Sequence, residues 1–208
     1  IPRKNLALLG GRPLLVWTVD QALQSTSIDR VIVSTEDDEI AAVALAAGAE
    51  VPFRRPAHLA QDITATEPVV EHLLDELAAR GEEPGLVMLL QATSPIRLPG
   101  TLDRLVAEQA ATGADSLVGV VPQAPFLWWR DDPPRADYDV TRRPRRQDLT
   151  DRTLRYRETG SAYLTKTDIY RCEHNRLGGR IELFVMAEVE RIDIDTELDF
   201  AFAERELA

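Results

Sequence analysis

Short, wholly apolar runs alternate with longer amphipathic stretches along this chain, and this alternation limits the folds that are open to it. The run LVMLL at 86–90 follows a helical pattern at 66–81 and precedes another at 100–111. A helix that connects two strands brings the chain back to the end of the sheet at which the first strand began, so the two strands run parallel. We therefore expect an α/β fold whose sheet is mostly parallel and doubly wound (Rossmann-like), with helices on both faces.

The other expected elements follow the same alternation. Helical patterns cover 13–25, 37–47 and 196–207, and strand-like or extended runs cover 30–34, 50–53, 115–121, 161–166 and 182–187. Ligands of such sheets bind beyond the carboxyl ends of the strands. Three polar motifs stand at such positions, because STEDDE, QATSPIR and DIDTE each follow an apolar run. We expect the functional site where these motifs meet.

The segment 123–158 does not follow this alternation of apolar runs and amphipathic stretches. It is rich in proline, arginine and aromatic residues, has no helical period and is too long for an idle loop in a compact domain. Exposed Trp128 and Trp129 would be costly, and aromatic and arginine side chains are enriched in the cores of interfaces. These features favour a protruding arm that packs against a second copy of the chain in a homodimer. The alternative is a flexible surface loop with a solvated run of charges.

The composition excludes several classes of protein. The chain has 208 residues, which suits one domain, and its formal net charge of −11 argues against nucleic-acid and anionic-membrane partners. A single cysteine permits neither an intramolecular disulfide nor a cysteine-based zinc site. No apolar run approaches the roughly 20 residues that span a bilayer, and no signal peptide is visible. We expect a cytoplasmic protein that needs local positive charge or metal to handle phosphates.

The motif RIDID, at 191–195, places two carboxylates close together. Side chains alternate across a strand, so Asp193 and Asp195 would share one face while Ile192 and Ile194 face the core. Two like charges at adjacent positions repel, and Mg²⁺ would offset that repulsion, because it prefers few carboxylate ligands plus water and substrate phosphates. The alternative is that Asp195 caps the following helix and Asp193 is simply exposed.

Two further motifs offer groups for anions. IPRKN presents Arg3, Lys4 and Asn5 in a loop, where they are either ligands of a phosphate and a base or merely exposed charges. In QATSPIR, Gln91 ends an apolar run, so its amide would project over the carboxyl edge of the sheet. Arg97 offers a planar fork of donors for a carboxylate or phosphate, although both residues could be ordinary turn residues.

The stretch FRRPAHLAQDITAT contains the last candidate motif. Arg55 precedes a proline, and a helix is expected to begin near Thr64 or Thr66. A threonine hydroxyl at a helix start commonly caps the helix, and it can also meet a ligand there, so the two interpretations are compatible.

These stretches together resemble one family. IPRKN, STEDDEIAAVALAAGAEVPFRRPAHLA, LLQATSPIR, RRQDL, ETGSAYLTK and RIDIDTELDF, taken in order, are similar to the acylneuraminate cytidylyltransferases, or CMP-sialic acid synthetases. The resemblance implies a sheet of the nucleotide-diphospho-sugar transferase type with a dimerisation arm. It also implies an Mg²⁺-dependent reaction in which CTP and a 2-keto sugar acid give a CMP-sugar and pyrophosphate.

The resemblance assigns roles to individual residues. It implies that CTP is contacted by Arg3, Lys4, Asn5, Arg55 and Thr66. It implies that Mg²⁺ is held by Asp193 and Asp195, and that these two aspartates and Lys4 are catalytic. It places Gln91 and Tyr163 at the acidic sugar acceptor, and Arg146 matches an arginine that reaches the neighbouring active site of a dimer. Arg97 is expected to join the acceptor-binding residues.

Two departures from the family pattern limit the assignment. The glycine- and lysine-containing phosphate loop is not present before Ile1, so we expect that loop and an N-terminal strand to precede this single domain, 1–208. Thr159 stands where many members have an asparagine. The acceptor could therefore be a different keto sugar acid or a phosphonate, and a nucleotide-binding relative without catalytic activity is the other alternative.

Overall fold

The sheet at the centre of the molecule has four strands in the order β3, β7, β4, β8. The computed structural model describes residues 1, 3–61 and 63–207. The strands are β3 (Leu86–Leu90), β7 (Arg155–Lys166), β4 (Ser116–Gln123) and β8 (Ile181–Val185). β4 and β8 pair in parallel, whereas β7 is antiparallel to both of its neighbours. Three strands thus point the same way and β7 is reversed, so the predicted α/β class is confirmed with a mixed sheet.

The reversal of β7 follows from its connection to β4. The segment between them, 124–154, leaves the sheet and returns as one long hairpin-like excursion, and chains that return beside their own strand pair antiparallel. No crossover helix intervenes between these two strands. The pattern of apolar runs could not signal this, because a reversed strand buried on both faces has the same composition as a parallel one.

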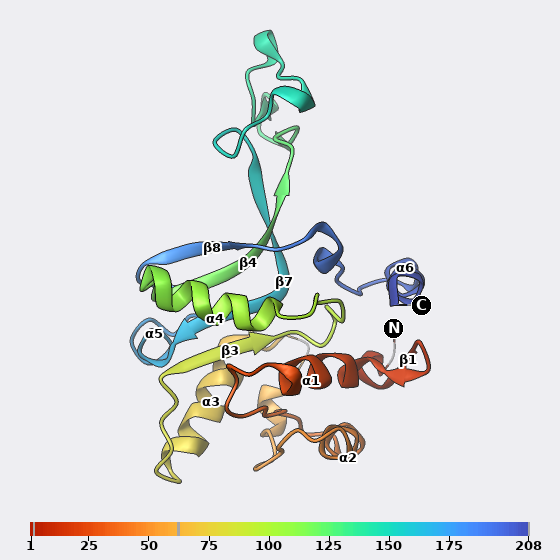
Figure 1. Ribbon diagram of the computed structural model, residues 1–208, viewed down its shortest axis with the longest axis vertical. Coiled ribbons are helices and arrows are strands. Elements are labelled where there is room, and N and C mark those ends of the chain that lie inside the picture. Colours follow the sequence, from red (N-terminus) through yellow and green to blue (C-terminus); the bar gives the residue numbers. More distant parts are fainter. Residues whose placement is uncertain (2, 62, 208) are drawn as a thin grey trace.

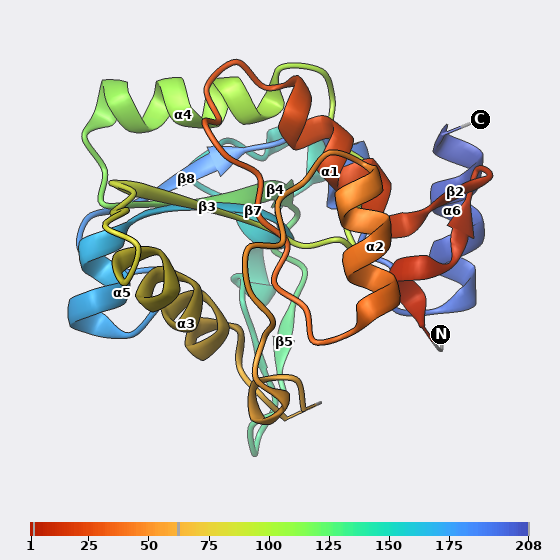
Figure 2. The ribbon, with the colours of Figure 1, turned by 90° about the horizontal axis from the view of Figure 1, so that it is seen from below.

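Helices cover both faces of the sheet, as the doubly wound prediction requires (Figure 2). On one face α4 (Thr101–Thr112) packs Leu102 and Leu105 against Leu117 and Phe184 of the sheet. On the other face lie α3 (Thr66–Ala78) and α5 (Thr167–Glu173), and their buried residues Val70, Leu74 and Tyr170 pack beside Val87 and Leu89.

The remaining elements flank the sheet at one end (Figure 1). They are η1 (Lys4–Leu6), β1 (Leu8–Leu9), β2 (Arg12–Pro13), α1 (Leu14–Gln24), α2 (Asp38–Ala46), η2 (Ala57–Leu59), η5 (Glu188–Arg191) and α6 (Glu197–Leu207). The core between α1, β1 and α6 contains Leu9, Leu14, Ile194 and Ala203. Within the described ranges, none of the helices combines the length and the apolar composition that crossing a bilayer requires.

The predicted strand 30–34 and the predicted extended piece 50–53 form only one isolated bridge. Residues 30–34 and 50–53 pair only where Ile32 faces Glu50, in parallel, with the Glu50 N–H donating to the Val31 carbonyl at 2.8 Å. A strand requires a run of backbone partners, and this pairing is too short to provide one. Val31 and Val33 are nevertheless packed beside α1 and α2, so the apolar run was correctly predicted to face the core.

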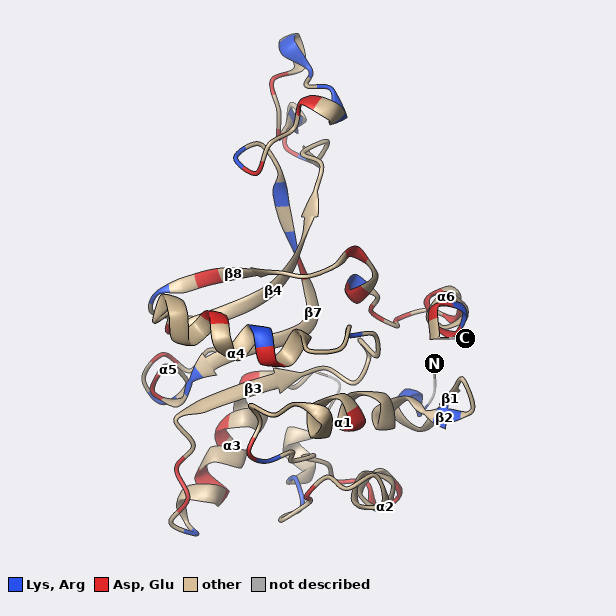
Figure 3. Ribbon diagram, in the orientation of Figure 1, with Lys and Arg blue, Asp and Glu red and all other residues tan. Residues whose placement is uncertain are grey.

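The predicted insertion projects from the sheet (Figure 1). We call residues 123–158 the arm. It consists of the outer parts of β4 and β7 together with β5 (Trp128–Trp129), β6 (Arg135–Ala136), η3 (Val140–Arg142) and η4 (Arg146–Asp148). Basic residues lie at its tip and along its β7 stem (Figure 3). The arm is therefore a structured projection rather than the flexible loop of the alternative interpretation.

Candidate active site

The segment that carries the two aspartates is extended but is not a strand, so that prediction was wrong. It lies between η5 and α6 and is fixed by one backbone hydrogen bond, from the Ile194 N–H to the Thr93 carbonyl at 2.8 Å. The expected alternation holds without a sheet, because Ile192 and Ile194 are buried and join the core beside α6. Burial of these two isoleucines turns Asp193 and Asp195 to the other side of the chain.

Asp195 does not cap the helix that follows. Thr196 and Asp199 form that cap reciprocally: the Asp199 N–H donates to the Thr196 hydroxyl at 3.2 Å, and the Thr196 N–H donates to the Asp199 carboxylate at 2.8 Å. Hydrogen bonds from Thr196 also lower the pKa of Asp199 below its ordinary value. The capping alternative for Asp195 is therefore wrong, and its side chain is left 75% exposed for another role.

Asp193 lies beside Gln91 over Gly160. A Cβ atom at Gly160 would lie 2.6 Å from Gln91 Oε1 and 3.9 Å from Asp193 Oδ2, so both side chains approach this backbone closely. Gly160 also has a φ of +71°, which favours glycine. The Ser94 hydroxyl donates to Asp193 Oδ1 at 3.5 Å. Gln91 and Ser94 of one motif and the distant Asp193 thus lie close together, as predicted for Gln91 and Asp193.

Lys4 joins the second carboxylate to the N-terminal loop. Its Nζ donates to the Ile194 carbonyl and lies 3.2 Å from Asp195 Oδ1. Asn5 is next to it in η1. Arg3 points elsewhere, because its guanidinium donates to Glu39 Oε2 at 2.6 Å, at the start of α2. The structure thus groups Lys4 with Asp195 and separates Arg3 from them.

Arg97 corrects one prediction. Its side chain is buried, with 6% exposed, and it donates to Thr18, Gln21 and the carbonyl oxygens of Gln91 and Ser161 at 2.6–3.1 Å. Burial lowers the pKa of Arg97 to about 10. A guanidinium with these partners has no face toward an acceptor, so Arg97 supports the site from beneath by tying the end of β3 to β7.

Tyr163 belongs to a polar network on the α3 face of the sheet. Its hydroxyl donates to Glu158 Oε2 at 3.0 Å, and the guanidinium of Arg176 stacks 5.3 Å from its ring. Arg176 in turn donates to Glu67 in the first turn of α3 at 2.6 Å. Burial and the nearby Glu158 raise the pKa of Tyr163. The network fixes the ring, and its polar end reaches the stem of the arm.

Thr159 is turned inward. Its hydroxyl donates to the Gly119 carbonyl at 3.0 Å and accepts from the Ser161 N–H at 3.1 Å, and the residue is buried. Its replacement of the family's usual asparagine therefore does not present a hydroxyl to the acceptor.

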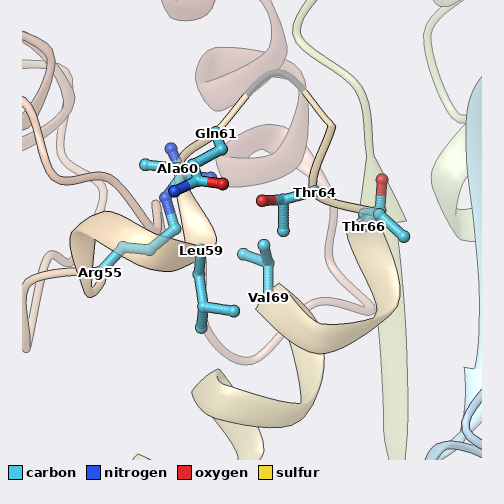
Figure 4. A pocket seen from close by; sticks show the side chains of 8 residues that line it. Arg55, Leu59, Ala60, Gln61, Thr64, Thr66 and Val69 are labelled. Atoms are coloured by element: carbon cyan, nitrogen blue, oxygen red, sulfur yellow. The ribbon is translucent and has the colours of Figure 1, made fainter.

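Arg55 and Thr66 lie at a separate pocket of about 160 Å³ (Figure 4). The pocket is lined by Arg55, Leu59, Ala60, Gln61, Thr64, Ala65, Thr66 and Val69. Thr66 is the first residue of α3, and the capping position belongs to Ala65, which has no capping side chain. Thr66 therefore does not cap α3, and the pocket combines one guanidinium with hydroxyl groups at a helix start.

Arg146 lies on the arm, in η4, and is exposed. The arm leaves the sheet from β4 and β7 and projects away from it, with η4 in its outer part (Figure 1). Within one protomer, the structure therefore does not bring Arg146 to the other predicted acceptor-binding residues.

The oxygen donors at the Asp193 patch suit Mg²⁺. Asp193 and Asp195 supply two carboxylates, and Ser94 lies beside the first of them. In the described part of the chain, no three or more His, Cys, Asp or Glu side chains cluster in a way that could hold a metal. A site with two carboxylates leaves room for water and substrate oxygens, which is the coordination that Mg²⁺ prefers.

Sequence reasoning missed the roles of Gly160, Ser94 and Glu36. Gly160 had a detectable signal, since it directly precedes the predicted strand-like run 161–166 and a glycine in or beside a strand can indicate close approach by another group. Ser94 and Glu36 had none beyond their place in the polar motifs that follow the apolar runs. Their partners, Asp193 and Arg55, are distant in sequence.

Comparisons with known proteins show the family of the chain. A family model described as cytidylyltransferase matches residues 1–125. The chain is 33% identical to a CMP-N,N'-diacetyllegionaminic acid synthase of Legionella pneumophila, over 99% of this chain and 89% of that protein. It is 32% identical to N-acylneuraminate cytidylyltransferase A of Danio rerio over 99% of this chain, but it spans only 47% of that protein's length.

A solved structure supports the fold. The structure of a CMP:2-keto-3-deoxy-manno-octonic acid synthetase complexed with CTP superposes with a TM-score of 0.67 at 13% identity, covering 100% of this chain and 92% of that one. The family model spans more than half of the chain, and the legionaminic acid synthase matches it over nearly its whole length. The chain therefore belongs to the cytidylyltransferase family that includes the N-acylneuraminate cytidylyltransferases.

Proposed function

We propose that this protein transfers CMP from CTP to the anomeric hydroxyl of a nonulosonic, sialic-type sugar acid. The hydroxyl oxygen forms a bond to the α-phosphorus, the bond between that phosphorus and the α–β bridging oxygen breaks, and pyrophosphate leaves. The hydroxyl proton passes to solvent. No covalent enzyme intermediate is required, so catalysis consists of positioning the reactants and neutralising charge.

The convergence of Gln91 and Asp193 over Gly160 is the observation that carries this proposal. The amide can bind hydroxyl or carboxylate groups of a sugar acid, while the neighbouring carboxylate lies where a phosphate and its counterion would meet that acceptor. Lys4 stands next to Asp195 and would neutralise phosphate oxygens. In this proposal, the acceptor and the phosphate groups therefore bind at adjacent positions.

In this proposal, the pocket of Arg55 and Thr66 receives the nucleotide base. The pocket lies near the start of α3, and the guanidinium and hydroxyl groups around it are donors for a polar heterocycle. In this proposal Arg3 and Asn5 assist Lys4 at the nucleotide, although Arg3 would have to leave Glu39 to do so.

Asp193 and Asp195 would hold one Mg²⁺ in this proposal. Bound there, the ion supplies charge stabilisation to the transferring phosphoryl group. The chain's own contribution is to hold the two carboxylates apart from the helix cap and to keep Lys4 beside them.

The acceptor class rests on Gln91 and the relatives, because Tyr163 is buried and its hydroxyl donates to Glu158. The names of the two relatives refer to sialic-type acids, one an N-acylneuraminate and the other a diacetyllegionaminic acid. The buried Thr159 removes the sequence-based reason to expect an unusual acceptor. Other keto sugar acids and phosphonates remain the second choice and belong in the same assay.

We further propose a cytoplasmic homodimer. The arm exposes Leu127, Trp128, Trp129 and Val140, an apolar set that a second copy would cover. The same contact would place Arg146 at the acceptor carboxylate of the partner's site.

Pyrophosphate release tests the activity. The protein, Mg²⁺ and CTP are incubated with N-acetylneuraminic, legionaminic, pseudaminic and 2-keto-3-deoxy-octonic acids and with phosphonates. We expect release with a nonulosonic acid and formation of the matching CMP-sugar. Turnover only with a phosphonate would contradict the acceptor class, and no CTP-dependent release with any acceptor would contradict the proposed function.

A further inference from the structure

An acidic residue outside the base pocket fastens the pocket's guanidinium. Arg55 donates from Nε and from Nη2 to the same carboxylate oxygen of Glu36, at 3.1 and 2.6 Å. The Arg55 backbone N–H also donates to the Thr35 carbonyl at 3.1 Å. Both the main chain and the side chain of Arg55 are therefore tied to residues 35–36.

Glu36 itself stands on fixed backbone. Thr35 is buried, and its hydroxyl accepts a hydrogen bond from the Asp37 N–H at 3.1 Å. Asp37 caps α2 through the backbone N–H groups of Glu39 and Ile40. Partial burial raises the pKa of Glu36, but the hydrogen bond and the charge of Arg55, together with a backbone hydrogen bond, outweigh burial and leave this pKa below the ordinary value. The carboxylate of Glu36 is therefore charged at neutral pH, and hydrogen bonds fix the neighbouring residues Thr35 and Asp37.

The adjacent arginine provides a contrast. Arg54 pairs with Asp38, and these side chains are 49% and 92% exposed, against 23% and 39% for Arg55 and Glu36. Arg54 does not line the pocket. The Arg54–Asp38 pair is thus an ordinary surface ion pair, which contributes little, whereas the Arg55–Glu36 pair is partly enclosed and adjoins a cavity.

The fixed orientation has a chemical consequence. A guanidinium has five N–H donors in a rigid plane, and the edge formed by Nε and Nη2 is committed to Glu36. The remaining donors lie at its other edge, and Arg55 lines the pocket (Figure 4). Cytosine offers two adjacent acceptors, O2 and N3, whereas N3 of uracil bears a hydrogen.

We propose that Glu36 is a positioning residue for nucleotide selection, which holds the free edge of Arg55 toward the O2 and N3 acceptors of cytosine. This inference rests on the proposed function, and it adds a residue through which that function would discriminate between CTP and UTP. A mobile guanidinium would satisfy either base with help from water, whereas a fixed one penalises the N3–H of uracil.

Steady-state kinetics of Glu36→Gln test the proposal. Loss of a hydrogen bond to a charged group corresponds to about a tenfold change or more. We expect KM for CTP to rise about tenfold and the CTP-to-UTP ratio of kcat/KM to fall by a similar factor, with kcat and the acceptor KM nearly unchanged. Asp38→Asn is the matched control, and it should leave all of these values at those of the wild type.

A double-mutant cycle separates positioning from a general electrostatic effect. If Glu36 acts through Arg55, the variant Glu36→Gln/Arg55→Lys should bind CTP no more weakly than Arg55→Lys alone. Additive losses would overturn the proposal, as would a Glu36→Gln variant that behaves like Asp38→Asn.

The outcome can be distinguished from failure of the proposed function. If the wild type produces no CMP-sugar, calorimetric titration with CTP and with UTP still measures the role of Glu36. Weaker CTP binding by Glu36→Gln than by Asp38→Asn, with lost preference over UTP, would support it. Equal binding by the two variants, or no preference of the wild type for CTP, would overturn it.

Discussion

The body of the molecule and its arm stabilise their aromatic and apolar residues in different ways. The body encloses them, and Leu117, Leu164 and Tyr170 are almost completely buried between the sheet and its helices. In the arm, Phe126 and Trp128 pack edge-on against Tyr138, and Arg143 stacks 4.3 Å from Phe126. In the described ranges, none of the buried apolar clusters includes an arm residue between 123 and 155.

This difference separates two tasks. The body's residues hold one protomer together and position Gln91, Asp193 and Lys4, whereas the arm's exposed tryptophans contribute little to the stability of a single chain. Large exposed apolar patches commonly mark interaction sites, so the exposed apolar residues of the arm fit the proposed contact with a second copy. The predictions below test whether activity and stability divide between body and arm in this way.

The largest effect is expected in the body. Asp193→Asn should reduce turnover about a thousandfold or more, because losing charge stabilisation at a transferring phosphoryl group costs several kcal/mol of barrier. Pyrophosphate release at saturating Mg²⁺ gives the rate, and circular dichroism checks that the fold is intact. Near-normal turnover would remove Asp193 from the metal site.

The second prediction compares how much a substitution in the core and a substitution in the arm lower the stability of the protein. Leu117→Ala removes a fully buried side chain and should lower the free energy of unfolding by about 2–5 kcal/mol. Trp129→Ala, in the exposed part of the arm, should leave the urea midpoint of dilute protein unchanged and weaken self-association in sedimentation. A large loss of stability in the arm variant would contradict the division between body and arm.

Arg146 tests whether the arm serves a neighbouring site. Arg146→Ala should lower kcat/KM for the acid acceptor about thirtyfold, as expected when a charge loses its partner across an interface. Mixing this variant with Asp193→Asn should restore some activity, because one mixed site then contains both groups. Full activity in a protein that sediments as a monomer would contradict the shared site.

The smallest effect concerns two ion pairs. Glu67 and Arg176, in the body, are 19% and 20% exposed, whereas Asp148 and Arg145, in the arm, are 48% and 70% exposed. Glu67→Gln should cost about 1 kcal/mol of stability at neutral pH, and Asp148→Asn should cost nothing measurable. Urea denaturation of both variants beside the wild type measures the difference.

The Glu67 contribution should also depend on pH. The hydrogen bond from Arg176 lowers the pKa of Glu67 below its ordinary 4.5, so the folded state favours the charged form. The stabilisation is therefore fully present above that ordinary value and disappears as the pH falls through the lowered one. Wild type and Glu67→Gln should converge in acid, and a constant difference down to pH 2 would contradict this cause.

Much of the fold could be predicted because apolar periodicity is a local property. The helices α1, α2, α3, α4 and α6 lie within a residue or a few of their predicted ranges. The failures arose where the outcome depends on distant partners. Residues 30–34 lack a continuous neighbour, and β7 is reversed because the arm returns beside β4.

The candidate site divides in the same way. Gln91 and Asp193 could be placed because their motifs follow apolar runs, whereas the role of Lys4 was implied only by the family resemblance. Arg97 could not, because a turn arginine looks alike in sequence whether it faces a ligand or, as here, donates to buried carbonyl oxygens. The capping alternative for Asp195 was also wrong, since Asp195 and Thr196 are both residue types that cap helices and only the hydrogen bonds show which one does.

The position of β7 also constrains the order in which the chain can fold. It fills the slot between β3 and β4, yet it is made after both of them and after all of the arm except residues 155–158, which belong to β7 itself. Until residue 166 has emerged during synthesis, β3 and β4 each expose an unpaired edge, which is a hazard for aggregation. Gly160 arrives on this central strand, so the backbone over which Gln91 and Asp193 lie is in place only once β7 has paired with both of its neighbours.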